Sequence, residues 1–198
     1  RSELESFALQ EEFFKQEGVG KRLSLREAFE HADSIARRVG IRSALLLALV
    51  TQESHLGEQQ GSGTWKDDMH PSQWAGFMTI VQRLGLNADA VPVSKKPEYG
   101  WGGAMGPAQF LPSTWLGHET EIAELTGHVL PSPWNIDDAL AGAAIKLAEA
   151  GAIQKTEAAE RKAALIYFAG ENWDNPAFGF YADSILELAR DIEKELKL

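Results

Sequence analysis

A single glutamate at the end of an apolar segment could act as a proton donor. The stretch "ALLLALVTQESHLG", residues 44–57, is apolar throughout its first half and then carries Glu53 and Ser54. In the last turn of a helix, Glu53 meets the partial negative charge of the helix C-terminus and apolar surroundings, and both disfavour a carboxylate. We therefore expect a raised pKa and a side chain that donates a proton near neutral pH. The alternative is a glutamate that points into solvent at a frayed helix end.

A glycine-rich segment further along the chain has the residue types of a sugar-binding loop. The stretch "GWGGAMGPAQFLPSTW", residues 100–115, places four glycines, two prolines and two tryptophans around Met105, Gln109 and Phe110. Glycines let the backbone approach a ligand closely, aromatic faces stack on sugar rings, and a glutamine side chain binds hydroxyls or amides. The same composition also fits a structural loop whose tryptophans fill the core.

A third stretch, "AALIYFAGENW", residues 163–173, ends an apolar helix with polar and aromatic groups. It brings Tyr167, Asn172 and Trp173 close together in the sequence. Taken alone, a tyrosine on an apolar helix face is typical of a core residue whose hydroxyl has a partner.

Composition narrows the possible function classes. The 198 residues carry a formal net charge of -10, which disfavours nucleic-acid binding because phosphates need a basic surface. The absence of cysteine excludes disulfides and thiolate chemistry. The histidines are scattered without a His-x-x-x-His pair, and neither a Gly-x-Ser-x-Gly nor a phosphate-binding motif occurs. We therefore expect no metal, no cofactor and no nucleic-acid partner.

The residues that could do chemistry must be positioned by helices. Apolar residues recur at helical spacing and alternating β-branched runs are missing, so the sequence predicts an all-α fold. Ser24 and Glu27 form a capping box for a helix that stops at Gly40, and Asn135 caps a helix that ends before Gly151. The predicted helices cover residues 24–40, 44–56, 72–84, 135–150, 155–170 and 175–196.

The sequence also predicts the organisation of the remaining segments. Residues 57–73 and 87–113 are long irregular stretches of the kind that form binding or lid loops. Residues 1–22 are expected to form an amphipathic helical lead-in, and residues 23–198 the functional domain. No apolar run approaches the roughly 20 residues of a membrane-spanning helix. Because the chain opens on Arg1, we expect that an anchor or another domain precedes the lead-in, and any membrane contact would come through it.

The three motifs, in this order, resemble those of the lytic transglycosylases, which share the goose-type lysozyme-like fold. "ALVTQESHLG" is similar to the first motif, a helix ending in Glu-Ser with the glutamate as sole catalytic acid. "GGAMGPAQFLPSTW" is similar to the second motif of the membrane-bound lytic transglycosylase B branch, and "IYFAG" to the third. "DDALAGAAIKLAEAG" resembles the helix between the second and third motifs of that branch. The resemblance covers roughly residues 24–188.

The sequence departs from that family pattern in two places. Phe168 occupies a position where the family commonly has asparagine, and Asn172 is the candidate to replace its polar contact. The Asp-x-Asp-x-Asp-Gly calcium loop of some members is missing, so the resemblance carries over no metal.

The resemblance implies a monomeric enzyme that acts on peptidoglycan glycan strands outside the cytoplasm and needs no cofactor. Glu53 would protonate the glycosidic oxygen between N-acetylmuramic acid and N-acetylglucosamine. It would then remove the proton of the muramoyl C6 hydroxyl, which attacks C1 and closes a 1,6-anhydro ring. The substrate's own N-acetyl group would stabilise the intermediate, so one carboxylate suffices.

The resemblance also implies roles for residues around Glu53. Ser54 would orient the acid or the acetamido group, and Tyr167 would hydrogen-bond Glu53. Met105, Gln109 and Phe110 would line the subsites at the scissile bond, and Trp101 would stack on sugar. The predicted substrate-binding residues are Ser54, Trp101, Met105, Gln109, Phe110, Tyr167 and Asn172.

Three other functions stay open at this point. A lysozyme-type muramidase needs a second carboxylate about 6.5–9.5 Å from the acid to activate water. The candidates for it are Asp67, Asp68, Glu98, Glu171 and Asp174. A non-catalytic peptidoglycan-binding module would keep the fold without turnover. A plain helical interaction domain would leave the glycine-rich loop unexplained.

Overall fold

Regular structure in this protein is helical throughout the part that the computed structural model describes, residues 23–198. The predicted all-α fold is thereby confirmed for these residues, in which β pairing is limited to three isolated bridges. The predicted lead-in over residues 1–22 lies outside the described residues. The α-helices are α2 (Leu25–Val39), α3 (Ser43–Ser54), α4 (Trp65–Asp68), α5 (Trp74–Arg83), α6 (Pro112–Thr126), α7 (Ile136–Glu149), α8 (Glu157–Ala169) and α9 (Gly179–Leu196).

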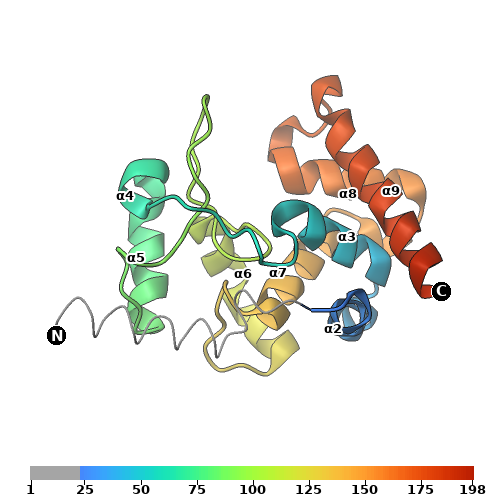
Figure 1. Ribbon diagram of the computed structural model, residues 1–198, viewed down its shortest axis with the longest axis horizontal. Coiled ribbons are helices and arrows are strands. Elements are labelled where there is room, and N and C mark those ends of the chain that lie inside the picture. Colours follow the sequence, from blue (N-terminus) through green and yellow to red (C-terminus); the bar gives the residue numbers. More distant parts are fainter. Residues whose placement is uncertain (1–22) are drawn as a thin grey trace.

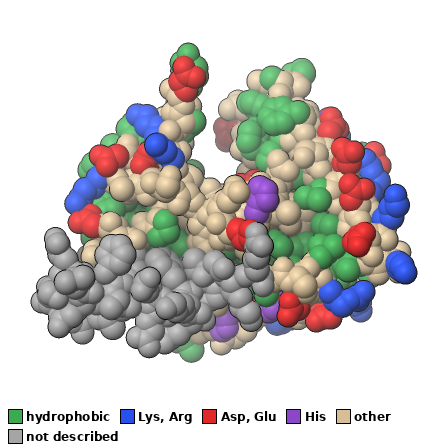
Figure 2. Space-filling view, in the orientation of Figure 1, with side chains coloured by type: hydrophobic (Ala, Val, Ile, Leu, Met, Phe, Trp, Pro, Cys, Tyr) green, Lys and Arg blue, Asp and Glu red, His purple; other side chains and the backbone are tan. Residues whose placement is uncertain are grey.

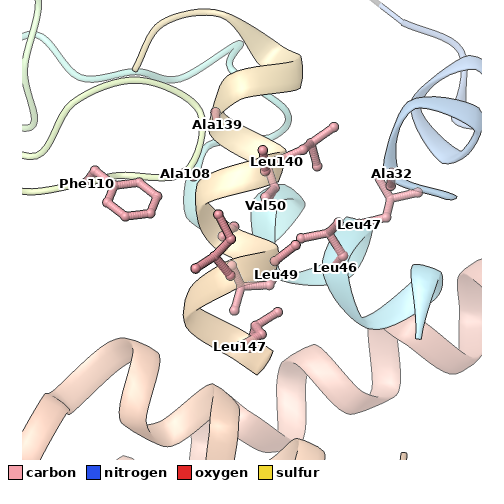
Figure 3. Packing of buried hydrophobic residues seen from close by; sticks show 14 of the residues in the cluster. Ala32, Leu46, Leu47, Leu49, Val50, Ala108, Phe110, Ala139, Leu140 and Leu147 are labelled. Carbon is pink, nitrogen blue, oxygen red and sulfur yellow. The ribbon is translucent and has the colours of Figure 1, made fainter. Parts of the chain in front are cut away.

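Helix α3 is buried on every side. All six side chains of residues 45–50 have no solvent exposure. Helices α2, α7 and α9 pack around it (Figure 1). Figure 3 shows Leu47 facing Ala32 of α2, and Leu49 and Val50 facing α7. A helix surrounded in this way needs an apolar residue at every position, which explains why the segment has no polar face.

The ends of α2 and α3 follow from local sequence. Ser24 and Glu27 form the predicted capping box, and Gly40 ends α2 in the left-handed conformation. Helix α3 ends at Ser54, two residues before the predicted end at Leu56. The difference arises because His55 and Leu56 have φ values of 50° and 58°, which turn the backbone out of the helix. Glu53 therefore occupies the last full turn.

The remaining predicted helices are present, and two further helices were not predicted. The segments expected at 72–84 and 175–196 each begin with a short 3-10 turn, Pro71–Gln73 and Pro176–Phe178. Helix α4 lies within a stretch expected to be irregular. Helix α6 begins at Pro112 and its N-cap residue, Leu111, supplies no capping side chain. Pro112 at its start and Gly127 after its end are the signals that mark it.

A cleft separates two sides of the molecule. Helices α4 and α5 lie on one side with a projecting excursion of the chain over residues 94–104, and α8 and α9 lie on the other (Figure 1). Backbone hydrogen bonds between Ser94 and both Gly103 and Ala104 close the base of the excursion. The space-filling view shows the hollow open between the two sides, and α3 ends at its floor (Figures 1 and 2).

Membrane insertion has no candidate helix in this part of the chain. Each helix between residues 23 and 198 is too short or too polar to span a bilayer.

A buried ion-pair cluster fixes the start of α3 against the last two helices. Arg42, which precedes α3, binds Glu160 of α8 at 2.6 Å and Glu193 of α9 at 2.9 Å. Glu160 is only 2% exposed, and the Arg42 guanidinium contacts both of its carboxylate oxygens. Bidentate contacts between a guanidinium and a carboxylate fix the relative orientation of the two groups, so the cluster sets how α8 and α9 lie relative to α3.

Removal of the Glu160 charge tests this role. Glu160→Gln removes the more buried of the two carboxylates on Arg42, leaves the contact with Glu193, and should lower the free energy of unfolding by about 1.5–3 kcal/mol, measured by urea denaturation. The control is Glu157→Gln, which breaks the exposed 3.6 Å pair between Glu157 of α8 and Arg190 of α9. The control should cost less than about 1 kcal/mol. Equal losses in the two variants would contradict the assigned role.

Candidate active site

The Glu53 carboxyl group is held at the edge of the core by a hydroxyl from another helix. Its side chain is half-buried in the last turn of α3. The hydroxyl of Tyr181, near the start of α9, donates a hydrogen bond to Oε1 of Glu53. Tyr181 is itself buried. The alternative of a glutamate pointing freely into solvent at a frayed end is therefore wrong.

The surroundings of Glu53 raise the proton affinity of its carboxyl group. Burial raises its pKa above the ordinary value, because desolvation disfavours the carboxylate. The hydrogen bond from Tyr181 and the charge of Lys146 act in the opposite direction, and burial prevails. This direction agrees with the sequence prediction. Burial and the nearby Glu53 charge also raise the pKa of the Tyr167 and Tyr181 hydroxyls, so both remain hydrogen-bond donors.

The glycine-rich motif forms a tight loop beside the end of α3. Met105 and Phe110 pair through two backbone hydrogen bonds, of 2.8 and 3.0 Å, and enclose residues 106–109. Gly106 has φ of 64°, and a Cβ there would lie 1.7 Å from the carbonyl oxygen of Pro133. Glycine is therefore required at that position. Gln109 also has positive φ, 53°, although it is not a glycine, which marks the loop as strained.

The hydroxyl groups of Ser54 and Tyr167 bind this loop and do not bind Glu53. The Ser54 hydroxyl donates to the carbonyl oxygen of Pro107 at 2.6 Å and accepts from the amide of Gly57 at 2.8 Å. The Tyr167 hydroxyl donates to the carbonyl oxygen of Ala108 at 2.6 Å. The predicted hydrogen bond from Tyr167 to Glu53 is therefore wrong, because the single phenolic proton is used elsewhere. Ser54 is 1% exposed and positions the loop instead of the acid or a substrate group.

Two other predicted binding residues lie beneath the loop surface. Met105 is fully buried and Phe110 is 2% exposed, so neither side chain lines a subsite as expected. The Phe110 ring instead packs edge-on against Trp115 and Tyr167, with centroids 5.4 and 6.3 Å apart. Gln109 is half-buried, and its amide nitrogen donates to the carbonyl oxygen of Gly106 at 2.9 Å. Of these three residues, Gln109 is the one at the loop surface.

Trp101 lies on the projecting excursion at one wall of the cleft. It is 46% exposed, and the Lys96 ammonium lies 3.9 Å from the centroid of its ring. His70 meets the same ring edge-on at 5.1 Å. These contacts hold the indole in place while leaving part of it open to solvent. The position agrees with the expected stacking role, which stays a prediction.

Aromatic side chains make the opposite wall. Phe168 stacks on Tyr181, with ring centroids 4.4 Å apart, and remains 46% exposed. Phe178 and Phe180 meet Phe168 edge-on, and apolar side chains gather over this end of α8 and α9 in Figure 2. The departure at Phe168 thus replaces a polar group with an apolar cover over the Tyr181 ring. Asn172 is exposed in a 3-10 turn, Gly170–Asn172, and its role in substrate binding stays a prediction.

Sequence reasoning missed two residues that act on Glu53. Tyr181 is 128 positions away in the sequence, and Lys146 lies on α7 among apolar residues. Lys146 is half-buried, and its ammonium lies 4.0 Å from the Tyr167 ring centroid. A lone lysine inside the apolar run "ALAGAAIKLA" was the one available signal for it. No local pattern marks Tyr181.

The acidic residues considered as a second catalytic group have different surroundings. Asp68 is buried and accepts from the amides of Thr64 and Lys96 at 2.7 and 2.8 Å, which holds its pKa below the usual range. It therefore secures the base of the excursion. The other four candidates are exposed side chains, at Asp67, Glu98, Glu171 and Asp174. Within residues 23–198, no group of three or more His, Asp or Glu side chains is arranged to hold a metal ion.

Loss of the Tyr181 hydroxyl should raise the pKa of Glu53 further. Tyr181→Phe keeps the ring stacked on Phe168 but removes a hydrogen bond that stabilises the carboxylate. The Glu53 carboxyl carbon is labelled with ¹³C, and its NMR signal is assigned from its absence in Glu53→Gln. The midpoint of its titration should lie at higher pH in Tyr181→Phe than in the wild type. Tyr167→Phe is the matched control, since that hydroxyl binds Ala108, and should move this titration less. An unchanged titration in Tyr181→Phe would contradict the hydrogen bond.

Comparison with known proteins identifies the fold. The structure is similar to that of the Escherichia coli lytic transglycosylase SLT35 in complex with bulgecin A, with a TM-score of 0.61 and 12% sequence identity. The match covers 86% of this chain and 74% of that chain. No family model and no curated protein matches the sequence. The predicted lysozyme-like fold of the lytic transglycosylases is confirmed, whereas the likeness to the membrane-bound B branch stays a prediction.

Proposed function

We propose that this protein is a peptidoglycan lytic transglycosylase in which Glu53 is the only catalytic acid and base. It would cleave the β-1,4 bond between N-acetylmuramic acid and N-acetylglucosamine and leave a 1,6-anhydro-muramoyl end. The observation that carries the proposal is the state of Glu53: half-buried at the floor of a cleft, bound by Tyr181, and with a raised pKa. A raised pKa increases the protonated fraction of the carboxyl group, and a general acid must carry its proton before the reaction.

The proposed reaction uses the Glu53 carboxyl group twice, first as an acid and then as a base. The Glu53 carboxylic acid gives its proton to the glycosidic oxygen as the bond from that oxygen to C1 of the muramoyl residue breaks. The substrate's N-acetyl group stabilises the positive charge at C1. The Glu53 carboxylate then takes the proton of the C6 hydroxyl, whose oxygen bonds to C1. The acid is regenerated, and no water is consumed.

The surroundings of Glu53 suit both halves of this cycle. Burial favours the acid before the first transfer, and the Tyr181 hydroxyl stabilises the carboxylate after it. The raised pKa of Tyr181 means that this phenol donates the hydrogen bond without losing its own proton. Gln109 at the loop surface is the proposed partner for hydroxyl or acetamido groups near the scissile bond.

The two walls of the cleft suit a chain of sugars. Trp101 on one wall and Phe168 on the other each keep part of an aromatic ring exposed. His70 and Lys96 contact the Trp101 ring, and Tyr181 stacks on one face of Phe168. Rings fixed in this way bind apolar sugar faces at little cost in side-chain entropy. A glycan strand lying between them would pass over Glu53. Because peptidoglycan lies outside the cytoplasm, we propose that the protein acts there, as a monomer.

Hydrolysis is the alternative that the arrangement supports less. An inverting muramidase needs a second carboxylate to activate water. Asp68 is the buried candidate, and backbone amides already occupy its two oxygens. The non-catalytic binding module would not require an acid held in its protonated form. Both alternatives differ from the proposed reaction in their products.

Product analysis on purified peptidoglycan tests the proposal. The wild-type protein should release 1,6-anhydro-muropeptides, detected by mass spectrometry, and Glu53→Gln should release none because the amide cannot donate the proton. Reducing ends in place of anhydro products would establish hydrolysis. Strand binding without any product would establish a binding module.

Stability provides the control for Glu53→Gln. A carboxyl group whose pKa is raised on folding contributes stability at low pH and loses it as pH rises through the folded-state value. Glutamine does not titrate, so Glu53→Gln does not lose stability in this way. The free energy of unfolding of the variant minus that of the wild type should therefore become more positive as the pH rises from 4 to 8. An inactive variant that is also unfolded would leave the product experiment to be repeated with Glu53→Ala.

Truncation of the exposed indole should weaken strand binding without affecting the acid. The Glu53→Gln background prevents turnover. In this background, Trp101→Ala should raise the Kd for insoluble peptidoglycan, measured by co-sedimentation, by about tenfold, equivalent to roughly 1.4 kcal/mol of binding free energy. Val129→Ala is the control, because Val129 is 99% exposed on the connection between α6 and α7. Equal binding by Trp101→Ala and Val129→Ala would contradict a role for Trp101 in strand binding.

A further inference from the structure

The last turn of α8 carries two aromatic residues that have different partners. The Tyr167 hydroxyl donates to the carbonyl oxygen of Ala108 in the glycine-rich loop. The next residue, Phe168, contacts α9 instead, where its ring stacks on Tyr181 with centroids 4.4 Å apart and 23° between the ring planes. Successive side chains on an α-helix point about 100° apart, so one turn can reach both segments. The end of α8 thus joins the loop to the helix that supplies the phenol bound to Glu53.

Phe168 contacts three aromatic residues at the start of α9. Besides stacking on Tyr181, its ring packs edge-on against Phe178 and Phe180, with centroids 5.5 and 6.2 Å away. Phe178 is the N-cap residue of α9, and its side chain makes no capping hydrogen bond. A helix start that lacks a side-chain cap depends on packing for its position. The three ring contacts therefore fix the turn that carries Tyr181.

Polar contacts between α9 and the α3 region lie further along α9. The Ser184 hydroxyl donates to Oε1 of Gln52 at 3.0 Å, and Glu193 binds Arg42 at 2.9 Å. These contacts hold α9 beside α3 (Figure 1). The direction of the Tyr181 side chain depends on its own χ1 torsion, and a ring stacked on its face restricts that rotation.

Phe168 also separates the phenol from the cleft. Its side chain is 46% exposed, whereas Tyr181 beneath it is 4% exposed. The Phe168 ring therefore covers one face of Tyr181 and keeps water from it. Asparagine, which is common at this position in the family that the sequence resembles, has no ring that could stack in this way. A flat aromatic face is thus the property of Phe168 that the contact with Tyr181 uses.

We propose that Phe168 is a positioning residue that holds the Tyr181 hydroxyl on the Glu53 carboxyl group by clamping the first turn of α9. The inference rests on the proposed function for its catalytic consequence alone. A tyrosine that is free to rotate about χ1 carries its hydroxyl away from a fixed acceptor, so the hydrogen bond is formed for only part of the time. With the ring clamped, the bond stays formed before and after the Glu53 proton leaves. Phe168 acts through Tyr181 in this role, separately from the aromatic surface that it offers to a sugar.

A double-mutant cycle measures the coupling between Phe168 and the Tyr181 hydroxyl without any substrate. In the wild-type protein, Tyr181→Phe should move the titration midpoint of the ¹³C-labelled Glu53 carboxyl group to higher pH. In a Phe168→Leu background, the same change should move the midpoint by about half as much or less, because the hydroxyl already binds Glu53 incompletely. Any direct effect of Phe168→Leu on the burial of Glu53 cancels, since both proteins of that pair carry it. Equal shifts in the two backgrounds would overturn the proposal.

Three further backgrounds make the cycle specific. Phe168→Tyr keeps the aromatic face and should restore the full shift. Phe180→Leu is the matched control, because it removes an exposed ring of the same cluster that meets Phe168 edge-on, and the shift should stay close to that in the wild type. Phe168→Asn supplies a second background without a ring if Phe168→Leu does not fold, since a half-exposed position accepts a polar residue. A loss of coupling in Phe180→Leu as large as in Phe168→Leu would overturn the proposal, and so would the absence of a shift in every background.

Turnover provides a second signature that packing alone would not produce. Phe168→Leu should lower kcat by about three- to tenfold, and Tyr181→Phe should lower kcat little further in that background. Loss of a sugar-binding face alone would raise KM and leave kcat unchanged, and that result would overturn the catalytic part of the proposal. The titrations need no turnover. A protein that releases no anhydro products would therefore refute the proposed function and leave the double-mutant cycle intact.

Discussion

Complete burial of residues 45–50 in α3 is the constraint on which the rest of the structure depends. A helix that is apolar on every face needs neighbours on every face, and α2, α7 and α9 supply them. Its last turn leaves the core at the floor of the cleft and carries Glu53 to that place. Hydrophobic packing therefore positions the acid, and the chemistry of Glu53 follows from the point at which the core ends.

The polar groups around this point fall into two sets with separate tasks. Tyr181 and Lys146 act on the carboxyl group itself, one by a hydrogen bond and one by its charge. Ser54 and Tyr167 instead fix the carbonyl groups of Pro107 and Ala108, so the strained loop keeps its shape. Separation of the two tasks means that the loop can be rigid while the proton affinity of Glu53 is set independently.

Sequence patterns predicted those features that lie within one element. The capping box at Ser24 and the apolar helix before Glu53 depend on neighbours a few residues away. The direction of the Glu53 pKa shift was also predicted, because an apolar helix indicates burial. Ser54 and Tyr167 were predicted to act on the acid or the substrate, and the structure instead binds their hydroxyl groups to the carbonyl oxygens of Pro107 and Ala108. Hydrogen-bond partners from distant segments depend on how helices rotate against one another, and no local pattern encodes that. Helix α6 was not predicted, and its N-cap residue, Leu111, has no capping side chain that would have marked its start.

The contribution of α9 has a consequence for the time at which the site is assembled during synthesis. The phenol that binds Glu53 and the second carboxylate on Arg42 both belong to the final helix, at Tyr181 and Glu193. A nascent chain that still lacks this helix has neither contact and exposes one face of α3. The Glu53 carboxyl group therefore reaches its final surroundings only after α9 has been synthesised and has docked against α3. Assembly of the site thus waits for a helix whose Tyr181 lies 128 residues further along the chain.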